Sequence, residues 1–402
     1  MRFALSASRY SPVFASANEF NFPRQQRAHV IGLFWIMQIA HRLISFCRNT
    51  KPVLPAIFSA SLLLTACGGS DSANVPSSVD NSRYRHHAAS AAINPVASDL
   101  FYGMNGHNSY GDVYYLAGAA RQLAQLQDLG IKLYRNEVYS KSTAMRLANV
   151  ANALAAGGVT VYPVILMGID FADEDSAYQS AYALARDVVS VQRYAYYEVT
   201  NELGSATVAG WVDGVRPTDF DNQKFQIARG VIRGMIAGIK SMDPSGKIVM
   251  GGNAWMQYGF VTMLANGTQP DGSGGHPIVT WDITAWHWYS DQGNIEHACG
   301  GTGCYNVIGA LARFGKPVWI NEMGVRPDFG TDQQAAAFLA NDMLGGLRAI
   351  AVRYDIESLQ IYQLYDDPPG GEGPYGVILD DGQTPKPAYA AVKQFIATNP
   401  RP

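Results

Sequence analysis

The sequence predicts an α/β protein built as a (β/α)8 TIM barrel, with a single domain over residues 99–402. Two observations lead to this prediction. Eight short apolar runs alternate with helical stretches, as expected for parallel β/α units. The runs begin 28 to 51 residues apart (at 132 and 160, for example, and at 196 and 247). Each interval therefore fits one strand, one helix and two loops, and eight such units form a closed barrel.

The eight apolar runs are the expected strands, and they lie at Leu100–Asn105, Lys132–Tyr139, Thr160–Met167, Tyr196–Glu202, Lys247–Asn253, Asp282–Tyr289, Pro317–Met323 and Ser358–Tyr365. The expected helices lie at Leu116–Leu129, Thr143–Ala156, Ser176–Val191, Asn222–Met242, Asn306–Phe314, Asp332–Ala349 and Pro387–Ala397. An open doubly wound sheet is the alternative, and it predicts a glycine-rich phosphate-binding turn after the first strand. The first strand here is instead followed by polar residues without a GxGxxG pattern, Gly103-Met104-Asn105-Gly106-His107-Asn108.

The N-terminal region has the pattern of an export signal. Basic residues precede an apolar run, Val53–Ala66, which ends in Leu64-Thr65-Ala66-Cys67. A basic region, a short apolar stretch and small residues are typical of a secretory signal, and the run is too short for a permanent transmembrane helix. The ending resembles the bacterial lipoprotein signal, which implies cleavage before Cys67 and a lipid on its thiol. The alternative is an ordinary signal peptide with an unrelated cysteine.

These features divide the chain into three parts. We expect residues 1–66 to be an N-terminal extension with a lipoprotein signal peptide. Residues 67–98 are rich in Ser, Asn, Ala and Val, and they are expected to form a flexible tether. The domain over residues 99–402 would then be exported and anchored to a membrane through Cys67, facing the periplasm or the cell exterior.

Two cysteines remain in the domain, Cys299 and Cys304, within His-Ala-Cys-Gly-Gly-Thr-Gly-Cys. Export into an oxidising compartment favours a disulfide between them, which would close a small glycine-rich loop. A zinc site that includes His297 is the alternative, but zinc would require further ligands close by.

Composition excludes one class of partner and leaves others open. The formal net charge is −3, and no run rich in Lys and Arg occurs in the domain. Nucleic-acid binding needs a dense basic surface, so we expect no nucleic-acid partner. The chain has 22 Tyr and 7 Trp, which suit stacking on sugars but also fill cores. We expect a monomer that requires no cofactor and no metal.

The C-terminal ends of the strands carry the candidate catalytic residues, because barrel enzymes place their active sites there. Strands four and seven each end in Asn followed by Glu, at Asn201-Glu202 and Asn321-Glu322. A single Glu at a strand end is most often a salt-bridge partner or a solvated residue, but a pair on opposite sides of the mouth is harder to obtain by chance. One carboxylic acid can protonate a leaving oxygen while the other carboxylate attacks an anomeric carbon.

This constellation resembles glycoside hydrolase clan A over nearly all of residues 99–398. The segments Tyr375-Gly376-Val377-Ile378-Leu379 and Lys386-Pro387-Ala388-Tyr389 are similar to family 39 of that clan. The resemblance implies that Glu202 is the acid/base and Glu322 the nucleophile. It also implies that Asn201 binds the sugar 2-hydroxyl, that Arg135 orients and ionises the nucleophile, and that His287 or Tyr289 contacts it.

The sequence departs from the clan at two positions. Val199-Thr200-Asn201-Glu202-Leu203 stands where Trp-Asn-Glu-Pro is frequent. Tyr365 is the nearest candidate for the Trp that closes the sugar subsite after strand eight. Further substrate contacts are expected from His107, Asn108, Trp255 and Trp288.

The sequence therefore predicts a retaining glycosidase that acts on a polysaccharide or exopolysaccharide at the cell envelope. Retaining enzymes hold their carboxyl groups about 5 Å apart, whereas an inverting hydrolase would need roughly 6.5–9.5 Å. The alternative from another class is a non-catalytic carbohydrate-binding lipoprotein on a barrel scaffold, which would bind glycans without cleaving them.

Overall fold

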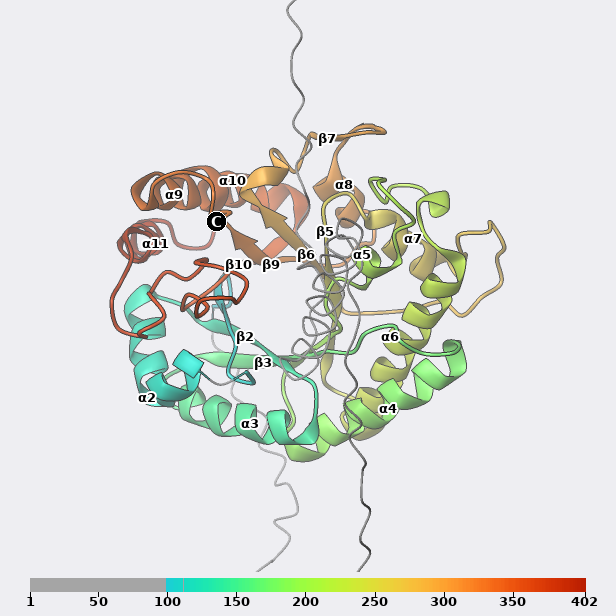
Figure 1. Cartoon of the computed structure of the whole chain (residues 1–402), viewed down its shortest axis with the longest axis horizontal. Coiled ribbons are helices and arrows are strands. Elements are labelled where there is room, and N and C mark those ends of the chain that lie inside the picture. Colours follow the sequence, from blue (N-terminus) through green and yellow to red (C-terminus); the bar gives the residue numbers. More distant parts are fainter. Residues whose placement is uncertain (1–98, 111) are drawn as a thin grey trace, which may run out of the picture. The chain divides into compact units, whose positions relative to one another are not determined.

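The computed structural model describes residues 99–110 and 112–402, so the expectations for the signal peptide, Cys67 and the tether lie outside the described residues. Eight parallel strands close into a barrel in the order β1-β10-β9-β6-β5-β4-β3-β2, and helices surround them (Figure 1). The predicted fold class is confirmed. The barrel strands are β1 (Tyr102–Gly106), β2 (Leu133–Val138), β3 (Thr160–Ile165), β4 (Tyr196–Val199), β5 (Lys247–Ala254), β6 (Ile283–Tyr289), β9 (Val318–Gly324) and β10 (Ile356–Ile361).

An apolar layer fills the barrel interior below the strand ends. Its members come from the first halves of five strands and are all buried: Leu133, Tyr162, Val249, Ile283, Ala285 and Trp319. The rings of Tyr162 and Trp319 meet edge to face, with centroids 5.6 Å apart. This layer closes the lower part of the barrel, and the candidate catalytic residues lie above it, at the C-terminal end where barrel enzymes hold their active sites.

The outer layer contains the expected helices together with several short ones. The helices are α2 (Asp112–Leu129), α3 (Lys141–Ala155), α4 (Glu174–Val191), α5 (Leu203–Thr207), η2 (Pro217–Asp219), α6 (Asn222–Met242), α7 (Tyr258–Asn266), η3 (Ser290–Gln292), α8 (Val307–Ala312), α9 (Asp332–Phe338), η4 (Leu339–Leu344), α10 (Gly345–Tyr354) and α11 (Pro387–Thr398). The sequence did not predict α7, because its nine residues are apolar on nearly every side and lack the polar stripe that marks an amphipathic helix.

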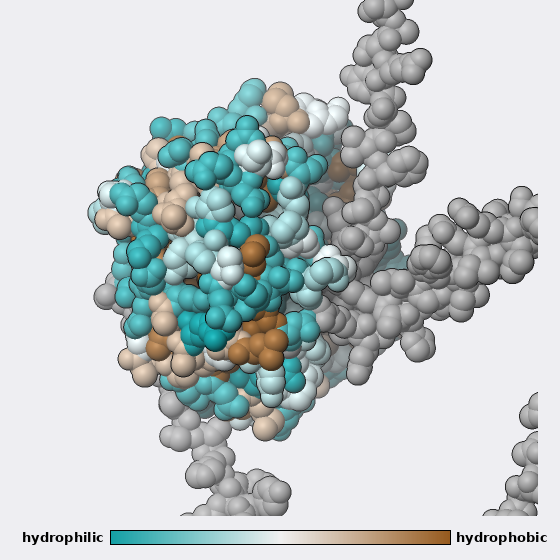
Figure 2. Space-filling model, turned by 60° about the vertical axis from the view of Figure 1, so that its left-hand side comes forward, coloured by the Kyte–Doolittle hydropathy of each residue, from teal (hydrophilic) through white to brown (hydrophobic). Residues whose placement is uncertain are grey.

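Among the described residues, one helical stretch, Asp332–Tyr354, is long and apolar enough to cross a membrane. In the barrel this stretch is α9, η4 and α10. Its buried side chains include Leu339, Leu344 and Leu347, so packing in the outer layer accounts for its apolar composition. Figure 2 shows one face of the domain, where hydrophilic residues cover most of the surface and apolar residues form small separate patches.

Two β-bulges distort the strands on either side of β6. Between Met250 and Asn253, β5 carries one residue more than the paired segment of β6. Between Ile320 and Met323, β9 carries one residue more than the paired segment of β10, and Asn321 is also the extra residue opposite β6. Bulges re-aim side chains at sheet ends, and these two lie directly beside the candidate catalytic residues.

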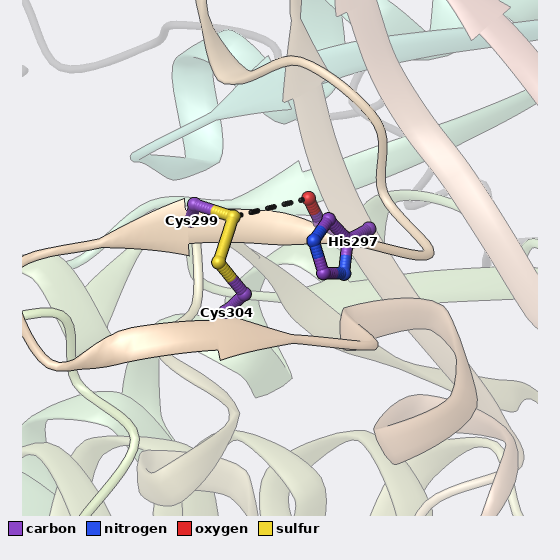
Figure 3. Close-up of side chains that lie close together, drawn as sticks. All are labelled: His297, Cys299 and Cys304. Carbon is purple, nitrogen blue, oxygen red and sulfur yellow. Dashed lines mark hydrogen bonds between the residues drawn. A yellow bond between two sulfur atoms is a disulfide. The ribbon is translucent and has the colours of Figure 1, made fainter.

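A short hairpin interrupts the connection from β6 to α8. Its strands, β7 (Ala298–Gly300) and β8 (Gly303–Tyr305), pair antiparallel. A disulfide joins Cys299 to Cys304 across the hairpin, as expected from the sequence, and the carbonyl oxygen of His297 lies 3.7 Å from the Cys299 sulfur (Figure 3).

Candidate active site

The two predicted catalytic carboxylates lie together at the barrel mouth. Glu202 follows β4, and Glu322 lies on the bulged segment of β9. One oxygen of each carboxylate and one ring nitrogen of His287 all lie within 4.8 Å of one another. The structure therefore brings side chains from the ends of β4, β6 and β9, the fourth, sixth and seventh strands of the barrel in chain order, into a single cluster.

Glu202 is held by an unusual turn of the backbone. Thr200 and Glu202 both adopt left-handed conformations, with φ of 70° and 48°, which non-glycine residues seldom occupy. The Glu202 N–H donates to the carbonyl of Gly252 over 2.7 Å, which fixes the turn. The Glu202 side chain is 32% exposed, so it can meet both a substrate and water at the mouth.

Arg135 connects most of the site. Its guanidinium is buried, and it donates to Glu198 through Nε (2.6 Å) and Nη2 (3.0 Å). It also donates to Glu322 through Nη1, to Asn105 (2.9 Å) and to Asn201 (2.7 Å). Burial alone would lower the pKa of Arg135, but the charges of Glu198 and Glu322 raise it well above its usual value. Arg135 therefore fixes the position of the Glu322 carboxylate.

Glu198 is a site residue that the sequence prediction missed. It lies on β4 and is fully buried. Besides Arg135, it accepts hydrogen bonds from Asn321 Nδ2 (2.8 Å) and from the Gly252 backbone (3.0 Å). A charged residue is buried in an apolar strand only when it is paired. That rule was the available signal, since Glu198 interrupts an otherwise apolar strand.

His287 lies between the two candidate carboxylates. Its Nδ1 atom is 2.7 Å from Glu202 Oε1 and 3.2 Å from Glu322 Oε2. Burial lowers the pKa of His287, but the charge of Glu322 and the contact with Glu202 raise it overall. For Glu202 the directions are reversed. Burial raises the pKa of the Glu202 carboxyl, but the hydrogen bond with His287 and the positive charges nearby lower it overall. The contact between Glu202 and His287 therefore favours the charged form of both side chains.

Tyr289 binds the second carboxylate from the same strand face. It lies two residues after His287, so both side chains point to one side of β6. Its hydroxyl donates to Glu322 Oε2 over 2.9 Å. Burial and the charge of Glu322 raise the pKa of Tyr289 well above 10, which keeps the hydroxyl protonated as a donor. Both alternatives offered by the sequence, His287 and Tyr289, therefore contact Glu322.

A second cluster of polar side chains lies at the mouth, near the ends of β1, β2 and β10. His107 Nδ1 lies 2.9 Å from Glu137 Oε2, and the Tyr362 hydroxyl donates to Glu372 over 2.5 Å. Burial lowers the pKa of His107, but the charge of Glu137 raises it to about 9. Within residues 99–402, omitting 111, the structure gives the buried Nε2 atom of His107 no hydrogen-bond partner.

The prediction for Tyr365 is wrong, and Tyr362 is the tyrosine of this segment that lies beside Tyr289. Tyr365 is fully buried, its hydroxyl donates to Gln125, and its ring packs on Tyr114. Tyr362 directly follows β10, and its ring centroid lies 6.2 Å from that of Tyr289. Two residues separate the two tyrosines, and only the fold shows which of them faces the site.

Two further residues that were predicted to contact substrate, Asn108 and Trp288, are buried and support the surrounding structure instead. Asn108 exchanges hydrogen bonds with Gln122 (2.9–3.0 Å) and donates two to Asn136 Oδ1 (2.7 and 3.2 Å), so it holds the loop after β1. Trp288 is also buried, and its indole N–H donates to the Gly293 carbonyl. It stacks on Trp255 with centroids 6.1 Å apart. Trp288 therefore supports Trp255, which is itself partly exposed.

Two clusters have the ligand types that a metal would need. Glu202, His287 and Glu322 form one, and His297, Cys299 and Cys304 form the other. In the first, Arg135 and His287 already place positive charge on the carboxylates. In the second, the disulfide occupies both sulfur atoms. We therefore assign neither cluster to a metal.

The chain combines a closed parallel barrel with two carboxylates and an arginine at the barrel mouth. No family model and no curated protein sequence matches the chain. Solved glycoside hydrolases share its fold. A β-glycosidase from Pyrococcus horikoshii superposes with a TM-score of 0.51 at 12% identity, over 75% of this chain and 97% of that one.

A family 39 glycoside hydrolase from Bacteroides cellulosilyticus WH2 superposes with a TM-score of 0.50 at 16% identity, over 74% of this chain. The chain spans 63% of the length of that enzyme. A β-glucosidase matches with a TM-score of 0.50 at 13% identity, over 75% of this chain and 98% of that one. The fold is therefore that of barrel glycoside hydrolases, and family 39 is among its matches.

Proposed function

We propose that the protein is a retaining glycoside hydrolase with Glu202 as acid/base and Glu322 as nucleophile. One observation carries this proposal: oxygens of the two carboxylates lie within 4.8 Å of one another. Carboxyl groups about 5–5.5 Å apart leave no room for a water molecule behind the sugar, whereas inverting enzymes need roughly 6.5–9.5 Å. The short separation supports direct attack by one carboxylate on the anomeric carbon.

Glu322 is suited to the role of nucleophile. Arg135 and Tyr289 both donate to it, so its negative charge is stabilised and its direction is fixed. In the first step a Glu322 oxygen bonds to the anomeric carbon while the glycosidic C–O bond breaks. The sugar is then held as an ester on Glu322.

Glu202 supplies and later removes the proton. It reaches His287 Nδ1 over 2.7 Å, so a proton on His287 can pass to Glu202 once a sugar displaces water from the mouth and the charged pair loses solvation. Glu202 then protonates the leaving oxygen. In the second step Glu202 accepts a proton from water, the water oxygen bonds to the anomeric carbon, and Glu322 leaves as a carboxylate.

The proposed substrate is a polysaccharide or exopolysaccharide outside the cytoplasm. Support for export comes from the signal pattern before Cys67 and from the disulfide in the hairpin, since structural disulfides persist mainly in oxidising compartments. A lipid on Cys67 would hold the domain at a membrane surface, where envelope polymers are within its reach.

The proposal is tested with Glu202→Gln and Glu322→Gln. Both variants keep the shape of the side chain, and each removes one chemical role. Release of reducing ends from soluble polysaccharides and bacterial exopolysaccharides should fall by at least about 1,000-fold in each, because catalysis by such groups acts as a unit. Binding should persist. Wild-type protein that binds these polymers without cleaving them would instead identify a carbohydrate-binding lipoprotein.

A further inference from the structure

Trp211 lies in the connection from α5 to α6 with 92% of its surface exposed. The neighbouring Val212 is 37% exposed. Single exposed aliphatic residues are common and need no explanation. An indole is different, because it is the largest apolar side chain and is mostly buried in other contexts. Its exposure makes Trp211 available for contact with a ligand.

The loop that carries Trp211 is held firmly at both ends. Val208 and Phe220 form an isolated β-bridge, and the Ala209 N–H donates to the Asp219 carbonyl over 2.8 Å. The Asp219 carboxylate accepts from the N–H groups of Val215 (3.0 Å) and Arg216 (3.1 Å). A loop with this many internal hydrogen bonds presents Trp211 to solvent in a defined position.

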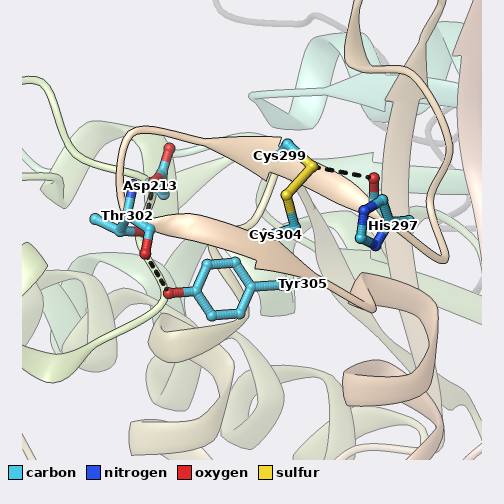
Figure 4. Close-up of a disulfide and its surroundings, with 6 residues drawn as sticks. All are labelled: Asp213, His297, Cys299, Thr302, Cys304 and Tyr305. Carbon is cyan, nitrogen blue, oxygen red and sulfur yellow. Dashed lines mark hydrogen bonds between the residues drawn. A yellow bond between two sulfur atoms is a disulfide. The ribbon is translucent and has the colours of Figure 1, made fainter.

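Asp213 fastens the same loop to the neighbouring parts of the mouth. Its carboxylate accepts from the indole N–H of Trp255 (3.2 Å), from the Thr302 backbone (2.7 Å) and from the Thr302 hydroxyl (2.5 Å). Figure 4 shows Asp213 facing Thr302 at the end of the disulfide-linked hairpin. A side chain on Gly300 would meet Asp213 at 2.1 Å, so the glycine permits this close approach.

These contacts form a continuous path from Glu202 to Trp211. Glu202 bonds to Gly252, and Trp255 lies three residues further along the same segment. Trp255 then bonds to Asp213. Trp211 is two residues from Asp213, which spans at most about 7 Å of chain. The loops after β4, β5 and β6 thus meet on the Glu202 side of the mouth.

The acid/base residue marks the leaving-group side of a glycosidase site, because it protonates the oxygen that departs. The sugar that bonds to Glu322 has another set of polar neighbours, from β1, β2 and the segment after β10: His107, Glu137 and Tyr362. Trp255 and the loop that carries Trp211 therefore lie on the Glu202 side of the mouth, toward which the departing part of a substrate would extend.

We propose that Trp211 and Trp255 form a binding platform for leaving-group-side sugar residues of a polymer, so that the enzyme cleaves within chains. This inference rests on the proposed function. The apolar faces of pyranose rings pack on indole rings, which offer a large flat surface and lose little conformational freedom. A platform beyond Glu202 adds nothing to binding of a substrate with a small leaving group. It favours a substrate that continues as a chain.

The test compares two substrates in matched variants. The short substrate is the p-nitrophenyl β-glycoside cleaved fastest in a panel of glucoside, xyloside, galactoside and mannoside. The long substrate is the fastest of xylan, mixed-linkage β-glucan, galactomannan and purified bacterial exopolysaccharide. In Trp211→Ala, the ratio of kcat/KM on the polymer to kcat/KM on the short glycoside should fall roughly tenfold, as expected for loss of an aromatic anchor. Trp211→Phe should keep most of the ratio.

Val352→Ala is the control, because Val352 is a 78% exposed apolar residue on α10, and it should leave the ratio unchanged. A second readout is the affinity of inactive Glu322→Gln for the same polymer, measured by calorimetry with and without Trp211→Ala. An unchanged ratio and affinity in Trp211→Ala would overturn the platform while leaving the hydrolase intact. Wild-type protein without activity on any member of either panel would contradict the proposed function itself.

Discussion

At the residue scale, Arg135 is the side chain on which the site depends most. It is buried and binds two carboxylates, Glu198 and Glu322. Removing one partner of a buried charge network leaves the others without compensation, and this costs more than the pair itself contributes. The same contacts that orient the nucleophile candidate therefore also stabilise the fold.

Arg135→Met should lower the free energy of unfolding by about 3–5 kcal/mol, because Glu198 is left buried without a cation. Urea unfolding at pH 7 measures the loss. Arg353→Met is the control, since Arg353 forms an exposed pair with Glu296, and exposed ion pairs contribute little to stability. Equal, small losses in both variants would contradict the role given to Arg135.

His107 gives a pH dependence with a definite sign. The folded-state pKa is raised from 6.5 to about 9 by Glu137, so the stabilisation is fully present below pH 6.5 and is lost as the pH rises through 9. The free energy of unfolding should fall by roughly 2–3 kcal/mol between pH 6.5 and 9.5. His107→Asn should reduce this slope. A slope that is identical in the variant would show that other groups cause it.

At the element scale, the bulges in β5 and β9 place the catalytic cluster. Asn321 is the extra residue in β9 opposite β6, and with it Asn321 and Glu322 reach Glu198 and Arg135. The bulge in β5 contains Gly252, where a Cβ atom would meet His287 Nε2 at 2.0 Å. The glycine therefore makes the room that His287 needs to lie between the two carboxylates.

Gly252→Ala should lower kcat/KM by at least about 100-fold, because a displacement of catalytic groups by about 1 Å has an effect of this size. Circular dichroism should show that the barrel remains folded. Gly346→Ala is the matched control, since a Cβ atom at Gly346 has no neighbour within 4 Å and alanine favours the helix. Full activity in Gly252→Ala would show that His287 does not need its observed position.

Strand positions could be predicted from the sequence better than the details of the site. All eight barrel strands follow from apolar runs, because a parallel strand buried on both faces is marked by its own composition. Glu198 was missed because its role depends on Arg135, 63 residues away. Tyr362 was missed because its direction depends on how the chain turns after β10. Apolar periodicity carries no information about either contact.

At the scale of the whole molecule, a predicted lipid anchor at Cys67 would attach the barrel domain to a membrane. Cys67→Ser should move the protein from the membrane fraction to the soluble fraction and abolish incorporation of labelled fatty acid, because one residue carries the proposed lipid. Hydrolytic activity should remain. Continued membrane association of the variant would favour an ordinary signal peptide and another mode of attachment.

The central claim is that Glu202 and Glu322 lie close enough for a double displacement. The measurement that tests it most directly is the anomeric configuration of the first product, followed by proton NMR during hydrolysis of the fastest β-linked substrate. We predict that the β-anomer appears first and the α-anomer only later, through mutarotation. An α-anomer at the earliest time points would contradict the account.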